Sequence, residues 1–103
     1  MSAAGGLIEQ MKVLLRVSSD VFDEEVEMLV EAAKAELIRV GIKQELVYHD
    51  NPDPLVKMAI SLSCKAHFGF DNPDAGRLEE IFRKTAVDLA NSDANVRAVK
   101  SND

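Results

Sequence analysis

The stretch from Asp53 to Phe68 constrains the fold most, because its pattern indicates a helix that is apolar around most of its circumference. Asp53 can accept hydrogen bonds from the first free N–H groups of a helix, and Pro54 suits the first helical position. The apolar positions are Leu55, Val56, Met58, Ala59, Ile60, Leu62, Cys64, Ala66 and Phe68. A helix with so wide an apolar surface is buried on more than one side. We expect it to be the central helix of a small bundle, and a neighbouring subunit could share its surface.

Three further helices are predicted around this central one, over about Leu7 to Arg16, Val21 to Arg39 and Asp74 to Asn91. Gly41 follows the second of them, as is typical just past a helix end. Ile42 to Asn51 is expected to be a packed loop or a turn of helix. The expected buried faces are Phe22, Val26, Leu29, Ala33, Leu37 and Val40 in the second helix, and Leu78, Ile81, Phe82, Thr85, Ala86 and Leu89 in the last. The predicted fold class is all-α, a small bundle of about four helices with a buried central helix.

The length of 103 residues permits one domain with a single core. We expect this helical domain to span residues 1–92, and residues 93–103 to form a polar C-terminal tail, because that segment lacks apolar periodicity. Residues 1–6 lack the basic and apolar segments of a signal peptide. No apolar run approaches the ~20 residues that cross a membrane. The protein is therefore expected to be made in the cytosol.

The residues that could carry chemistry do not form a catalytic or metal-binding motif. Cys64 and His67 are three apart on one helix, and the only other histidine, His49, falls in a connection. Structural zinc requires four N or S ligands, which this set does not supply. A cysteine nucleophile requires an aligned base, and Cys64 is surrounded by apolar residues, where a thiol is inert. We therefore expect no catalytic residue, no metal and no cofactor.

The formal net charge of −6 disfavours a protein that grips nucleic acid by its phosphates. The acidic run 23–25 lacks the glycine and the ligand spacing of a calcium loop, and it suits the solvated, positive end of a helix dipole. In the last helix, Arg77, Arg83 and Lys84 alternate with acidic residues. The alternative function, a small helical DNA-binding or anti-regulator protein, would need a basic face. Duplex binding at physiological salt would favour that alternative.

Several blocks of the sequence resemble the small head–tail connector proteins of tailed bacteriophages and prophages. They are Asp23 to Leu37 with Val40-Gly41-Ile42, Asp53 to Ile60 with Cys64 to Ala75, and, more loosely, Arg77 to Ser92. The aromatic-Gly-aromatic turn and the Asn-Pro of the second block are similar to the connector variant of phages and prophages of Gram-positive bacteria. None of the blocks is a catalytic motif, so the resemblance rests on their order and spacing over about residues 7–92.

The resemblance implies a structural adaptor that assembles as a ring on the portal, joins capsid to tail and lines the channel through which DNA leaves. Its implied partners are further copies of itself, the portal protein and tail-side completion proteins. The resemblance implies no association with a membrane. Double-stranded DNA would pass without specific binding, and an acidic lining agrees with that because like charge discourages phosphate contacts. The protein would be made in the host cytoplasm and become part of the virion at the capsid–tail junction.

Three residues are candidates for the oligomer interface: Met28, Phe68 and Phe70. Each is a large apolar side chain at or beyond the edge of a helix face that is already filled. Phe68 and Phe70 flank Gly69 at the end of the central helix. They could pack into the protein's own core or act as an aromatic anchor against a neighbouring subunit, and the sequence leaves both interpretations open.

Overall fold

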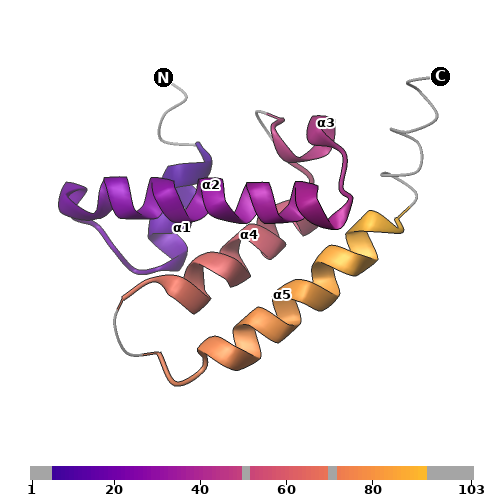
Figure 1. The fold of residues 1–103 in the computed structure, drawn as a ribbon. Coiled ribbons are helices and arrows are strands. Elements are labelled where there is room, and N and C mark those ends of the chain that lie inside the picture. Colours follow the sequence, from indigo (N-terminus) through magenta and orange to yellow (C-terminus); the bar gives the residue numbers. More distant parts are fainter. Residues whose placement is uncertain (1–5, 50–51, 70–71, 93–103) are drawn as a thin grey trace.

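The computed structural model describes residues 6–49, 52–69 and 72–92, and all regular structure in these ranges is helical (Figure 1). The elements are α1 (Leu7–Leu14), the 3-10 turn η2 (Asp20–Phe22), α2 (Asp23–Val40), α3 (Gln44–Val47), α4 (Pro54–His67) and α5 (Ala75–Ala90). The predicted all-α fold is confirmed, and the expected turn of helix in the connection is α3. Within the described ranges, no helix combines the length and the apolar character that a membrane span requires. Phe70 and the predicted tail, residues 93–103, lie outside the described residues.

The central position of α4 follows from its neighbours. It lies between α2 and α5, and it also contacts α1 (Figure 1). The side chains of Ala59, Ile60 and Cys64 are completely buried among these helices. On its remaining side Leu55 and Met58 stay exposed. The chain itself therefore covers most of the perimeter of α4, but not all of it.

The core contains side chains from all five α-helices. Met11 of α1, Val26 of α2, Val47 of α3, Ile60 of α4 and Phe82 of α5 are buried members of one apolar cluster. Burial of this kind contributes ~1.5–3 kcal/mol for each large apolar side chain, and it holds helices together that would be marginal alone. The short helices α1 and α3 therefore depend on this shared core.

The helix ends use the local chemistry that the sequence predicts. The Asp53 carboxylate accepts a hydrogen bond from the Leu55 N–H at 2.8 Å and so begins α4. The Ser19 hydroxyl accepts from the Val21 N–H at 3.2 Å, which starts η2 before α2 itself begins. Gly41 follows α2 with a φ of 123°, a left-handed conformation that suits glycine.

The buried faces of α2 and α5 differ in part from the predicted ones. In α2 the fully buried positions include Val30, whereas Leu29, which the pattern placed in the face, is only partly buried. In α5 the expected core residue Ile81 is partly exposed, while Phe82 and Ala86 are buried. The spacing of apolar residues predicts the buried face of each helix to within about one residue. Which of the neighbouring positions is buried then depends on where α4 packs against the helix.

Lys12 is a charged residue that the sequence pattern did not place in the core. It is only 5% exposed. Its Nζ lies 2.6 Å from Asp23 Oδ1 and 3.4 Å from Asp20 Oδ1, so the ion pair ties α1 to the start of α2. The hydrogen bond to Asp23 raises the pKa of Lys12. Asp23 of the acidic run 23–25 is therefore only partly solvated, with 45% of its side chain exposed, because the buried lysine needs a carboxylate partner.

Candidate assembly surface

Cys64 and His67 do not form a joint site. Burial raises the pKa of the Cys64 thiol to about 11, so the thiol is protonated and unreactive at neutral pH. His67 is the last residue of α4, and its half-exposed side chain instead contacts α5. Its Nε2 lies 2.9 Å from Oε2 of Glu79 in α5. In the part of the chain that the structure describes, no three His, Cys, Asp or Glu side chains are grouped closely enough to hold a metal ion. The arrangement is that of a core cysteine and an interhelical contact.

The exposed side of α5 is mixed in charge. Arg83 and Lys84 are exposed, but Glu80 and Asp88 are exposed on the same helix. A helix that tracks a phosphate backbone carries its cations on one face without intervening carboxylates. The described surface of α5 therefore lacks the recognition face that a DNA-binding regulator would use.

The first interface candidate, Met28, lies on the outer side of α2. Its side chain is 67% exposed. Val26 and Val30 are buried and point the other way, because two residues along a helix correspond to a rotation of about 200°. Glu24 and Glu31 lie one turn before and one turn after Met28 on the same side. Met28 is thus a large apolar side chain in an acidic surrounding.

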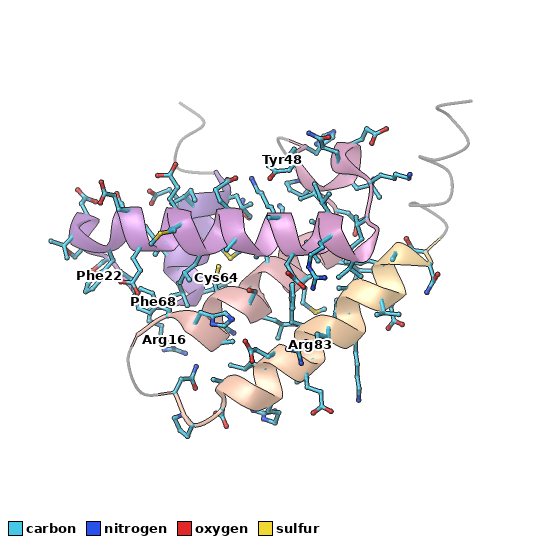
Figure 2. The ribbon with its side chains drawn as sticks, viewed as in Figure 1. Arg16, Phe22, Tyr48, Cys64, Phe68 and Arg83 are labelled. Atoms are coloured by element: carbon cyan, nitrogen blue, oxygen red, sulfur yellow. The ribbon has the colours of Figure 1, made fainter. Side chains whose placement is uncertain are left out.

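The second candidate, Phe68, combines a core contact with a surface position. It is partly buried against the core just after α4, and its ring meets Phe22 edge to face, with centroids 5.7 Å apart and planes at 71°. Figure 2 shows Phe22, Phe68 and Arg16 at the same end of the molecule. Its interface role stays a prediction, and the third candidate, Phe70, lies outside the described residues.

A groove between the C-terminal ends of α1 and α4, here called the α1–α4 groove, includes Phe68. It is lined by Val13, Leu14, Leu15, Arg16, Lys65, Phe68 and Asn72. Val13 is 75% exposed and Leu14 is half-exposed, although both are apolar. The Asn72 side chain donates a hydrogen bond to the Lys65 carbonyl at 2.6 Å, which holds Asn72 against the last turn of α4. Among the described residues, the lining is therefore mainly apolar, with two cations and no carboxylate.

The sequence contained a signal for this groove that the helical pattern alone did not use. Val13 and Leu14 are adjacent apolar residues at the end of α1, beyond the buried Met11. Val13 lies two residues beyond Met11, which corresponds to a rotation of about 200° around the helix, so it points away from the core that Met11 enters. Val13 therefore indicated an apolar surface outside the core, but its partners across the groove come from α4 and follow only from the fold.

A second groove lies between α2 and α5. It is lined by Leu29, Ala32, Glu36, Ser63, His67, Glu79, Phe82 and Arg83. Arg39 donates a hydrogen bond to Glu36 at 3.1 Å, and this contact lowers the pKa of Glu36. His67 is engaged with Glu79 across the groove. Most charges of this second groove are therefore already paired within the chain, in contrast to those of the α1–α4 groove.

The comparisons with known proteins identify a family. A family model described as "Phage connector protein" matches residues 7–96, which include every helix described above. No curated protein matches the chain, and no solved structure matches it.

Proposed function

The chain belongs to the phage connector protein family, and we propose that it joins the phage head to the tail by assembling as a ring on the portal protein. The observation that carries the proposal is the family match over most of the chain, together with the apolar side chains that the fold leaves uncovered. The protein would act through assembly, with no catalytic step and no cofactor. Its domain would be residues 1–92, with residues 93–103 as the polar tail.

Exposed apolar side chains support an assembly role. Val13, Val21 and Met28 are large apolar residues that are mostly exposed. Single exposed apolar residues are common on soluble proteins, but apolar residues gathered beside a groove mark interaction sites. The α1–α4 groove supplies such a place, and Phe68 lies in it. Met28, Phe68 and Phe70 remain the interface candidates of the proposal.

The charge distribution supports a channel through which DNA passes without being held. The chain carries a net charge of −6, and the cations of α5 alternate with carboxylates. Phosphates that approach such a surface release few counterions, so tight binding has no driving force. We propose that the ring lines the path of the genome and that the portal and the tail-side completion proteins are its protein partners. It would be made in the host cytoplasm and reside at the capsid–tail junction of the virion.

The proposal is tested by the light-scattering mass of the pure protein, alone and mixed with the portal of the same phage. The expected result is a complex of defined stoichiometry with the portal, whether or not the free protein is already a ring. A duplex DNA fragment at physiological salt serves as the control ligand, and no complex with it is expected. A monomer that ignores the portal and retards the DNA would overturn the proposal and favour the helical regulator.

A further inference from the structure

We propose that Met28 of one copy enters the α1–α4 groove of the next copy, so that copies join head to tail. The inference deepens the proposed function and rests on it for ring closure, because it names the contact between neighbouring subunits. The occupant of the groove is therefore a second copy of this chain. Three features carry the inference: the chemistry of the groove, the chemistry around Met28 and the directions in which the two surfaces face.

The groove requires a partner that is apolar and acidic. Val13, Leu14 and Phe68 supply apolar contact area. Arg16 and Lys65 are exposed, and neither makes an ion pair with any described residue. Two cations that have no ion-pair partner among the described residues, beside apolar side chains, favour a partner that brings carboxylates around an apolar group.

The outer side of α2 has that chemistry. Met28 is exposed between Glu24 and Glu31, and Glu24 has no ion pair within the described part of the chain. Glu31 meets Lys34 at 3.5 Å on the surface, a weak contact that a stronger partner can replace. An unbranched methionine adapts to an irregular apolar groove. The same chain thus carries both complementary surfaces.

The two surfaces of one molecule cannot meet each other. Met28 points away from the core, opposite to the buried Val26 and Val30. The groove is formed by α1 and α4, and both helices contact α2. Because the core-facing side of α2 is the one that holds Val26 and Val30, these contacts place α1 and α4 across the helix from Met28. A contact between two different patches is heterologous, and it generates a ring when the rotation closes.

The test is cross-linking between two purified variants, each in a Cys64→Ala background. One chain carries Met28→Cys and the other Leu14→Cys. They are mixed at millimolar concentration, alone and with the portal, and treated with a short thiol-specific cross-linker. We expect cross-linked pairs that contain one chain of each kind. Met58→Cys is the matched control, because Met58 is also an exposed methionine (46%) but lies outside the proposed contact, so it should not cross-link to Leu14→Cys.

A charge exchange distinguishes a specific contact from chance collisions. Glu24→Lys in the Met28→Cys chain should lower the cross-linking yield about fivefold to tenfold, because it places like charges together. Arg16→Glu in the Leu14→Cys chain should lower it similarly. Combining the two substituted chains should restore most of the yield, since the charges are then opposite again. These positions are exposed, so the variants keep the fold.

The outcomes separate this inference from the proposed function. If Met28→Cys and Leu14→Cys do not cross-link, either alone or with the portal, the inference is wrong. Cross-linking of Leu14→Cys to the portal in place of a second copy would also overturn it. A normal portal complex without the Met28–Leu14 cross-link would leave the connector function standing. If the Met28–Leu14 cross-link formed but no complex with the portal did, the inferred contact between subunits would be supported and the proposed connector function would be wrong.

Discussion

Two apolar regions of this chain have opposite environments. In α4, Ile60 and Cys64 are completely buried, because α1, α2 and α5 surround them. At the end of α1 and in η2, Val13 is 75% exposed and Val21 is 80% exposed, although both are as apolar as the residues of α4. Apolar character alone therefore does not place a residue in the core, since another element of the chain must cover it. We interpret the first region as the folding core and the second as an assembly surface.

The largest effect is expected from Ile60→Ala in the core region. Truncation of this fully buried side chain leaves a cavity in the apolar core, and the free energy of unfolding should fall by ~2–5 kcal/mol. Met58→Ala on the same helix is the control, because Met58 is partly exposed and its replacement should cost less. Urea unfolding followed by circular dichroism measures both. Equal losses for the two variants would contradict the division between core and surface.

The next effect is a loss of stability at alkaline pH that depends on Cys64. Folding raises the pKa of this thiol from its ordinary value of 9.0 to about 11, so the unfolded chain releases a proton that the folded chain retains. Stability should therefore fall by about 1–2 kcal/mol between about pH 8 and about pH 10.5. Cys64→Ala should be less stable throughout but should lack this slope.

A second titrating group, Lys12, changes the stability only at and above the upper end of that pH range. The raised pKa of Lys12 means that its stabilising charge is present below the ordinary value of 10.5 and is lost as the pH rises through the raised value. Denaturant titrations of the wild type and of Cys64→Ala at each pH separate the two contributions. If the free energy of unfolding fell equally with pH in both proteins below about pH 10, burial would not be what keeps the Cys64 thiol protonated.

The smallest effect on stability is expected from Val13→Ser in the exposed region. Val13 contacts solvent more than core, so its replacement should change the free energy of unfolding by less than ~0.5 kcal/mol. Assembly should nevertheless weaken, because the groove loses apolar area. Light-scattering mass with the portal reports assembly, and urea unfolding reports stability. A large loss of stability with normal assembly would place Val13 in the core region.

Much of the fold was predictable, because it depends on local chemistry. The cap at Asp53, the glycine after α2 and the apolar circumference of α4 each determine structure within a few residues. The burial of Lys12 was not predictable from spacing, because it depends on where α1 meets the start of α2. Val30 is fully buried and Leu29 only partly, and this difference similarly depends on how α2 packs against α4.

The candidate surface was predictable only in part. Met28 lies at the outer side of α2, as expected for a residue beyond a filled helix face. The position of Phe68 at the end of the central helix made it an interface candidate. Its contact with Phe22 was not predictable, because it joins segments far apart in the sequence. The α1–α4 groove combines residues of α1 and α4 with Phe68 and Asn72, which follow α4. No single periodic pattern contains such a site, so it required the arrangement of the helices.

The most direct test of the proposed contact between subunits is the oxidation rate of each methionine by hydrogen peroxide, in the free protein and in its complex with the portal. In the free protein, Met28 and Met58 should oxidise and the buried Met11 should resist. In the complex, the account predicts that Met28 becomes protected while Met58 keeps its rate. Oxidation of Met28 at the same rate in the complex as in the free protein would contradict it.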